Sequence, residues 1–377
     1  MQARQSIPMP SALENQDQRH PSGNEVAVLL RWDGEPKRTD TILNDLSSFE
    51  SEIGFESDNL STGGTIEQLE HRFCEMLNKE AAAFIPTGTL ANHLALRRLC
   101  GLKPRAIVQE QSHLYNDTSD CVTRLSSIKL HPLGNGKTCF SYEELKAAIE
   151  QVSETGISGD VIGAVMIESP VRNQRGRIVP YDEMESITSL CKEWGISTHL
   201  DGARLYMMSG VTGIPARKYA ALFDTVYVSM YKYFGAPYGA ILAGTMEVIQ
   251  DVRQDRRMFG GSLASSYLAA GMALNGAKDF EDRFREALTK AHALFELLNN
   301  LPGISIKQLD HGSNIYPVEL GVDVDVQRFI SILRKNWVFV YPDREDSKQL
   351  HFTVNTTILR QDNSELAKAF EQALQKS

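Results

Sequence analysis

The chain has no long hydrophobic run, and this absence narrows the classes of protein to which it can belong. No apolar stretch among its 377 residues approaches the length needed to cross a bilayer. The first 25 residues are polar, contain prolines and lack the apolar core of a secretory signal. We therefore expect a disordered or arm-like tail over 1–25 and no association with a membrane.

Cysteines and clustered metal ligands are also scarce. The five cysteines are an odd number and none forms a CxxC pair, which argues against a disulfide framework and favours a reducing, cytoplasmic compartment. The nine histidines form no HExxH motif and no close cluster with cysteine, so no metal site is expected.

Basic charge is not in excess. The 39 Lys and Arg are outnumbered by 48 Asp and Glu, which gives a formal net charge of −9 at pH 7. No block of Lys and Arg departs from this balance. Nucleic acid is therefore not an expected partner.

Strand-like and helix-like segments alternate from about Thr65 onward. Runs such as AAAFIP, VIGAVMIES and DTVYVSM are apolar almost throughout, as in strands covered on both faces. The alternation predicts a mostly parallel sheet in an α/β architecture. After about residue 270 a long helical stretch leads into short strands and a final amphipathic helix. We predict a large domain over 26–270 and a small α+β domain over 271–377.

The most informative stretch runs from Thr198 to Gly244, where an acid and an amine follow two successive strand-like runs. Asp201 follows ISTHL, and Lys232 follows VYVSMY. In open parallel sheets, ligands bind at the carboxyl ends of the strands. A buried Lys can form an imine with an aldehyde, and a carboxylate can keep a pyridine nitrogen protonated. The pair indicates a pyridoxal phosphate (PLP) site, although either residue alone is more often a surface amine or a helix cap.

Other polar positions could serve the same site. Arg204 suits bidentate binding of a substrate carboxylate, and Ser229 could donate to a phosphate oxygen. The segment Thr87–Thr89 joins a strand to a helix, whose first N–H groups attract an anion. His113 could stack on a planar ring or transfer a proton. Each has an ordinary structural alternative, such as a salt bridge or a helix cap, but their joint order along one sheet favours a site.

These segments together resemble the threonine aldolase/β-eliminating lyase family of PLP-dependent enzymes. The motifs are NKEAAAFIPTGTLANHLAL, QSHLY, HLDGARL and SMYKYFGAPYGAILAG, and the resemblance extends from about Gly63 to Gly261. It implies a fold type I enzyme, with a mostly parallel seven-stranded sheet in the large domain and a small C-terminal domain. It also implies a homo-oligomer, a dimer of dimers whose active sites draw on both subunits.

The resemblance assigns roles to the matching positions. Lys232 would be the Schiff-base lysine, Asp201 the partner of the pyridine nitrogen, and His113 the residue stacked on the cofactor ring. Arg204 would bind the substrate carboxylate. The phosphate would be bound by a further set: Thr87, Gly88, Thr89, Ser229, and Arg257 of a neighbouring subunit.

The chain departs from the aldolase pattern at several places, and two of the family's three contacts to the substrate carboxylate are altered. Trp32 stands where the aldolases have a Ser, and ESPVRN introduces Arg172 in place of E-N-T-H-N. His351 is the nearest match to a C-terminal Arg of the aldolases. We expect Arg172 and His351 to bind the substrate, either replacing the lost contacts or serving another substrate.

The resemblance leads to one expected reaction and two alternatives. The leading expectation is cleavage of the Cα–Cβ bond of a β-hydroxy-α-amino acid to glycine and an aldehyde, with His113 or a water it orients as the base. In a β-elimination, Lys232 would remove the Cα proton and the products would be a keto acid and ammonia. The third alternative is a PLP-fold subunit without turnover, against which the retained Lys232 and Asp201 argue.

Overall fold

The computed structural model describes residues 25–154, 161–342 and 349–377, so the predicted tail lies almost entirely outside the described residues. Its elements, in order, are β1 (Val28–Leu29), α1 (Thr39–Glu52), α2 (Thr65–Leu77), β2 (Ala81–Ile85), α3 (Gly88–Cys100), β3 (Arg105–Gln109), α4 (His113–Asn116), α5 (Cys121–Ser126), β4 (Lys129–Leu133), α6 (Tyr142–Glu154), β5 (Ile162–Glu168), η1 (Arg172–Gln174), α7 (Tyr181–Glu193), β6 (Ser197–Asp201), α8 (Leu205–Thr212), α9 (Ala216–Ala221), β7 (Thr225–Ser229), β8 (Ala240–Gly244), α10 (Met246–Met258), α11 (Tyr267–Ala277), α12 (Phe280–Asn299), β9 (Ile304–Ile306), β10 (Ile315–Leu320), α13 (Val326–Lys335), β11 (Val338–Phe339), β12 (Leu350–Thr353), η2 (Thr356–Arg360) and α14 (Asn363–Lys376).

The large part of the molecule is built on a seven-stranded sheet of order β2-β8-β7-β6-β5-β3-β4. Strand β8 runs antiparallel to both of its neighbours, and the other pairs are parallel. The predicted mostly parallel seven-stranded sheet is confirmed. The strands other than β8 therefore place their carboxyl ends at one edge of the sheet.

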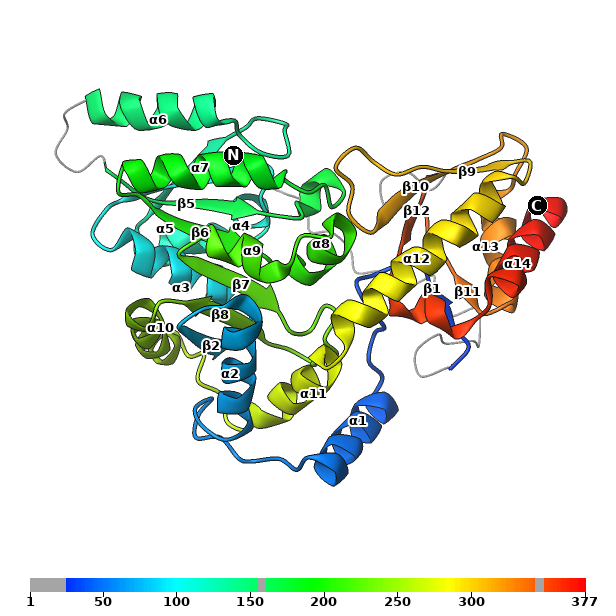
Figure 1. Cartoon of the computed structure of the whole chain (residues 1–377), viewed down its shortest axis with the longest axis horizontal. Helices are drawn as coiled ribbons and strands as arrows, with labels where there is room; N and C mark the ends of the chain where they lie inside the picture. Colours follow the sequence, from blue (N-terminus) through cyan, green and yellow to red (C-terminus); the bar gives the residue numbers. More distant parts are fainter. Residues whose placement is uncertain (1–24, 155–160, 343–348) are drawn as a thin grey trace.

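Both faces of this sheet are covered by helices, as the continuous apolar runs predicted (Figure 1). In β2, Phe84 packs into the cluster that contains Phe73 of α2, whereas its neighbour Ile85 packs into the one that contains Leu94 of α3. Successive strand residues point to opposite faces, so a strand covered on both faces must be apolar throughout.

The smaller part contains a three-stranded antiparallel sheet of order β12-β10-β9 and the parallel pair β1-β11. The long helix α12 runs from the large part to the small sheet (Figure 1). Residues Val28–Leu29 lie here beside Val338–Phe339, although the sequence assigned them to the domain 26–270. A two-residue strand is too short to show a sequence pattern. The division at residue 270 stays a prediction.

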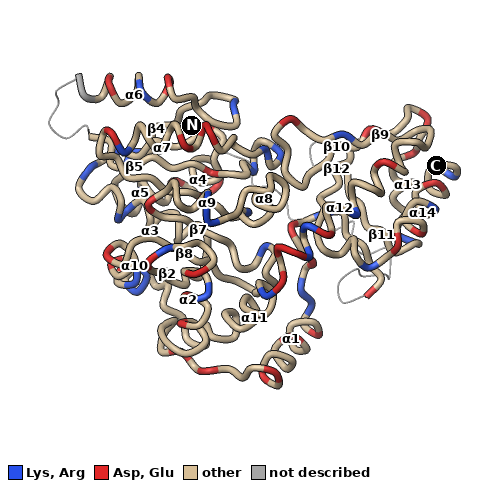
Figure 2. Tube along the Cα trace, viewed as in Figure 1, with Lys and Arg blue, Asp and Glu red and all other residues tan. Residues whose placement is uncertain are grey.

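No helix in the described part of the chain combines the length and the apolar content needed to cross a bilayer. Acidic and basic residues are interspersed along the trace in both parts of the molecule (Figure 2).

Candidate active site

A cavity of about 610 Å³ opens where several strands of the large sheet reach their carboxyl ends. Glu168, Asp201 and Tyr227 lie side by side in register on β5, β6 and β7, and all three line the cavity. Most of the predicted site residues line it too: Thr87, Gly88, Thr89, His113, Arg172, Asp201, Arg204 and Lys232. The structure thus brings these residues together at one edge of the sheet.

Asp201 is held by a chain of buried hydrogen bonds. Its Oδ2 accepts from Asn92 Nδ2 at 2.6 Å, and its Oδ1 accepts from the N–H of Ala203 at 3.1 Å. Since the Asn92 amide nitrogen donates to Asp201, its oxygen must accept from His199 Nε2, at 2.9 Å. His199 Nδ1 then accepts from the hydroxyl of Thr225 at 2.8 Å. Burial lowers the pKa of His199 to about 4, so its ring is neutral and its tautomer is set by these partners.

Lys232 stands in the loop after β7 and faces the same cavity. Burial, and secondarily the positive charge of Arg204, lower the pKa of Lys232 to about 8. Among the described residues its ammonium group forms no hydrogen bond or ion pair. A lysine of lowered pKa and without a fixed partner is suited to form a bond with a carbonyl carbon.

The start of α3 is shaped to bind an anion. Thr87 is the N-cap, and its Oγ1 accepts from the N–H of Leu90 at 3.2 Å. A Cβ at Gly88 would lie 2.0 Å from the hydroxyl of Tyr227, so only glycine allows the helix to begin this close to that ring. The first N–H groups of a helix have no partner within it, and they point to this end of the cavity.

Ser229 lies at this end of the sheet but beneath the cavity. It is fully buried at the end of β7, where its side chain interacts with that of Tyr227, and it does not line the cavity in the described chain. The α3 terminus, Asp201 and Lys232 together fit a ligand carrying a phosphate, a ring nitrogen and an aldehyde, which are the groups of PLP.

His113 and Arg172 are held in place by one carboxylate that the sequence analysis did not single out, Glu168. This residue is buried; its Oε2 accepts from the N–H of His113, and its Oε1 accepts from the N–H of Arg172 at 2.8 Å. Burial, and secondarily the charge of Asp201, raise the pKa of Glu168 to about 7, while burial lowers that of His113. The sequence does contain a signal for Glu168, since this residue is an acid at the end of the apolar run VIGAVMIES.

Arg204 forms an ion pair with Asp33, another residue that the sequence analysis missed. Arg204 Nε lies 2.6 Å from Asp33 Oδ1, and their side chains are 20% and 15% exposed. The terminal nitrogens Nη1 and Nη2 of Arg204 make no hydrogen bond within the described residues. A guanidinium group has five N–H donors, and the pair with Asp33 uses the one on Nε. Of the four that remain, one on Nη1 and one on Nη2 point in parallel and can bind a carboxylate.

Three predicted site residues do not line the cavity in the described chain: Ser229, Arg257 and His351. Ser229 is packed beneath it, in the sheet. Arg257 is exposed on α10, because the neighbouring Arg256 is the one that turns inward to the carbonyl of Phe84. His351 lies in β12, opposite Pro317 in the small sheet.

Arg172 and Trp32 occupy the region where the sequence departs from the aldolase pattern. The Arg172 side chain is 52% exposed and its nearest acid, Asp117, is 3.8 Å away, so it is held only weakly. Trp32 has a left-handed backbone (φ 63°), and its ring lies 5.4 Å from that of Tyr341. Arg172 therefore brings a half-exposed positive charge to the cavity, whereas Trp32 lies at the bend that precedes Asp33.

Fold and cavity define an enzyme of the PLP-dependent fold type I class. A model of the beta-eliminating lyase family matches residues 38–319, and the chain belongs to this family.

Relatives and solved structures agree with this membership. Low-specificity L-threonine aldolase 1 of Arabidopsis thaliana is 23% identical over 352 residues, which cover 92% of this chain and 96% of that protein. A candidate aromatic amino acid beta-eliminating lyase/threonine aldolase of Exiguobacterium sp. 255-15 matches with a TM-score of 0.77 at 26% identity, covering 93% of this chain and 98% of that one. A candidate L-allo-threonine aldolase of Listeria monocytogenes EGD-E matches with a TM-score of 0.75 at 26% identity, covering 93% and 97%.

Proposed function

We propose that the chain is a PLP-dependent lyase that cleaves the Cα–Cβ bond of a β-hydroxy-α-amino acid, giving glycine and an aldehyde. One observation carries the proposal: Lys232 of lowered pKa and the anchored Asp201 line one cavity with the anion-binding start of α3. The names of the Arabidopsis, Exiguobacterium and Listeria proteins support it.

The residues of the cavity divide the work. Bound PLP would supply an electron-withdrawing ring for the substrate bond at Cα. Lys232 would hold the cofactor aldehyde, and Asp201 would keep a proton on the ring nitrogen, with Asn92 and His199 fixing its orientation. Residues Thr87–Thr89, at the start of α3, would bind the phosphate.

The β-hydroxyl proton needs an acceptor, and His113 is the best placed candidate. Its pKa is lowered by burial, so its imidazole is neutral at physiological pH and can accept a proton. Glu168 fixes the backbone of His113 and so keeps the ring in the cavity.

The carboxylate of the substrate would bind two arginines. Arg204 offers Nη1 and Nη2 in a fixed orientation because Asp33 holds Nε. Arg172 adds a second, more mobile charge. This assignment replaces the C-terminal contact expected of His351, which does not line the cavity in the described chain.

Product analysis tests the proposal. Purified protein with PLP is incubated with L-threonine, L-allo-threonine and phenylserine, and glycine and aldehyde are quantified. We expect equal amounts of both products from at least one substrate, and none from Lys232→Ala. No glycine from any β-hydroxy amino acid would refute the aldolase reaction.

A β-elimination is the second candidate, favoured by the family description and by the name of the Exiguobacterium protein. Lys232, with a pKa of about 8, is a suitable base for a Cα proton. Cysteine and tryptophan would then yield a keto acid and ammonia. These products without glycine would favour this reaction.

The assembly and the compartment belong to the same proposal. We infer a cytoplasmic homotetramer, a dimer of dimers, in which the exposed Arg257 reaches the phosphate site of a neighbouring subunit. The five cysteines are free thiols, which is compatible with a reducing compartment.

A further inference from the structure

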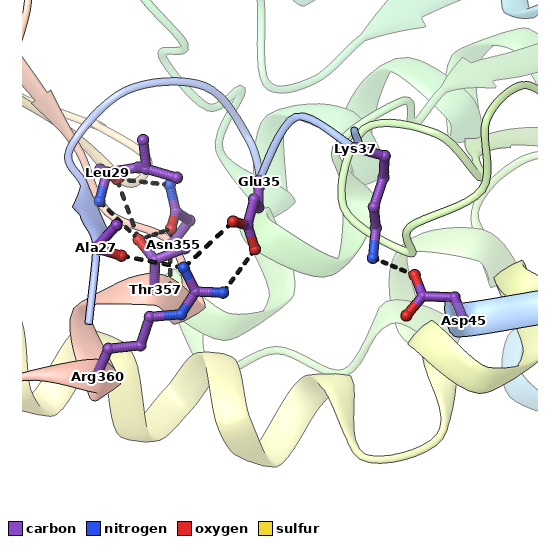
Figure 3. A network of polar contacts seen from close by, with 8 residues as sticks. All are labelled: Ala27, Leu29, Glu35, Lys37, Asp45, Asn355, Thr357 and Arg360. Atoms are coloured by element: carbon purple, nitrogen blue, oxygen red, sulfur yellow. Dashed lines mark hydrogen bonds and ion pairs between the residues drawn. The ribbon is translucent and has the colours of Figure 1, made fainter. Parts of the chain in front are cut away.

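The segment 27–37, hereafter the N-terminal strap, runs from the small part of the molecule past Glu35 and Lys37 toward α1 (Figure 3). It begins at β1 in the small part and reaches the cavity wall at Asp33. Gly34 follows, where a Cβ would lie 3.1 Å from the carbonyl oxygen of Lys232. The strap therefore passes against the loop that carries Lys232.

Asn355 fixes the path of the strap. This buried residue precedes η2, and its Nδ2 donates to the carbonyls of Leu29, Arg31 and Trp32 at 2.9, 3.2 and 3.3 Å. Trp32 has the left-handed backbone at which the strap bends. One amide thus holds both sides of the turn immediately before Asp33.

Arg360, at the end of η2, fixes the strap on the other side of Asp33. It pairs with Glu35, with side chains 26% and 14% exposed, and its Nη1 also donates to the carbonyl of Ala27 at 3.0 Å (Figure 3). Charged residues of both signs gather where the strap passes between the two parts (Figure 2). Ion pairs that are mostly buried depend strongly on the presence of both partners.

We propose that Asn355 and Arg360 are positioning residues for substrate binding, acting through Asp33 on Arg204. The inference rests on the proposed role of Arg204 toward the substrate carboxylate. Both residues hold the strap, the strap presents Asp33, and Asp33 orients the guanidinium group of Arg204. The small part of the molecule would thereby contribute to carboxylate recognition without touching the substrate.

Glycine binding to the PLP-loaded enzyme tests this inference, read from the absorption of the bound cofactor. We expect Arg360→Gln to weaken glycine binding by about fivefold or more, corresponding to roughly 1 kcal/mol of lost coupling. Arg360→Lys, which keeps the charge, should recover part of the affinity. The control Arg285→Gln removes an exposed arginine of α12 that makes none of the contacts to the strap described above. It should leave the affinity for glycine unchanged. Unchanged affinity in Arg360→Gln would overturn the inference.

A double-mutant cycle separates positioning from general destabilisation. If Arg360 acts through Asp33, Arg360→Gln should have little further effect on glycine affinity in an Asp33→Asn background. The same fold-change in both backgrounds would overturn the inference. Should Arg360→Gln fail to fold, Glu35→Gln breaks the same pair from the other side and is measured in the same cycle.

Glycine affinity also keeps this inference distinct from the proposed reaction. A protein that binds glycine but releases none from β-hydroxy amino acids would refute the aldolase reaction and leave the positioning role standing. A wild-type protein that binds no glycine would overturn the positioning role.

Discussion

At the scale of single residues, the cavity is governed by which polar groups have partners and which do not. Asp201, His199 and Asn92 satisfy one another inside the protein, whereas the ammonium group of Lys232 has no hydrogen-bond partner in the described chain. Buried groups without partners are costly and mark the places where a ligand is expected.

Loss of Asn92 should damage both stability and cofactor binding. Asn92→Ala leaves Asp201 and His199 buried and without the amide that bonds to both of them. The lost hydrogen bonds should lower the free energy of unfolding by about 1–3 kcal/mol for each of these two groups. We expect a lower midpoint of thermal unfolding and weaker retention of PLP on dialysis. Asn300→Ala removes an exposed amide that directly follows α12 and serves as the control. Normal PLP retention in Asn92→Ala would contradict the role of these hydrogen bonds in cofactor binding.

Lys232 should make the stability of the cofactor-free protein depend on pH. Its pKa is about 8 in the folded state, below the value of 10.5 for an unperturbed lysine, so the unfolded state binds more protons between these values. Stability should therefore gain a contribution as pH rises from 8 toward 10.5, and the cost of burying the charge is fully present below pH 8. We expect Lys232→Met to unfold at higher urea concentration than wild type at pH 7, with a difference that shrinks by pH 10. A difference independent of pH would show that Lys232 is not desolvated.

The residues that line the cavity could be predicted from the sequence where they follow the end of a strand. They were missed where only a tertiary contact brings them to the cavity. Asp201 and Lys232 come directly after apolar runs and His113 lies shortly after one, so the edge at which they meet follows from the topology of a parallel sheet. Asp33 belongs to the cavity only because the strap passes it, and no local pattern reports that contact.

At the scale of elements, α3 combines a structural cap with a binding surface. Thr87 caps its first turn, and the free N–H groups of that turn face the cavity. Helix α10 begins in the same way, with Thr245 accepting from the N–H of Val248, but away from the cavity. Comparing variants of these two caps therefore separates an effect on stability from an effect on PLP binding.

Removing either cap should cost the same stability but affect PLP differently. We expect Thr87→Ala and Thr245→Ala each to lower the free energy of unfolding by about 1 kcal/mol. Only Thr87→Ala should weaken PLP binding, measured by titrating the apoprotein with PLP. Equal PLP affinity in the two variants would argue against a phosphate at the start of α3.

The long apolar elements were the most predictable part of the fold. The strands of the large sheet other than β4 are near-continuous apolar runs, α12 and α14 carry clear helical periodicity, and the structure contains all of them. The short strands β1 and β11 were not delimited, because two-residue strands are defined by their pairing with each other and not by a pattern of their own.

At the scale of the whole molecule, the two parts are joined by α12 and by the N-terminal strap. The strap returns from the small part to the cavity, so substrate binding in the large part depends on contacts made in the small one. Sequence periodicity cannot report such long-range contacts, since residues 29 and 355 are far apart in the chain.

Arg257 tests the proposed assembly. If this exposed arginine of α10 serves the phosphate site of a neighbouring subunit, Arg257→Glu should weaken PLP binding about tenfold or more without changing the thermal midpoint of the apoprotein. Arg328→Glu alters an exposed arginine of α13 and should leave PLP binding unchanged. A monomeric mass in light scattering, with normal PLP affinity in Arg257→Glu, would refute the assembly.

Reduction of the PLP-loaded protein with borohydride, followed by peptide mass mapping, shows which lysine holds the cofactor. We predict one stable phosphopyridoxyl label, on Lys232, and no label in Lys232→Ala. A label on another lysine, or undiminished labelling of Lys232→Ala, would contradict this prediction.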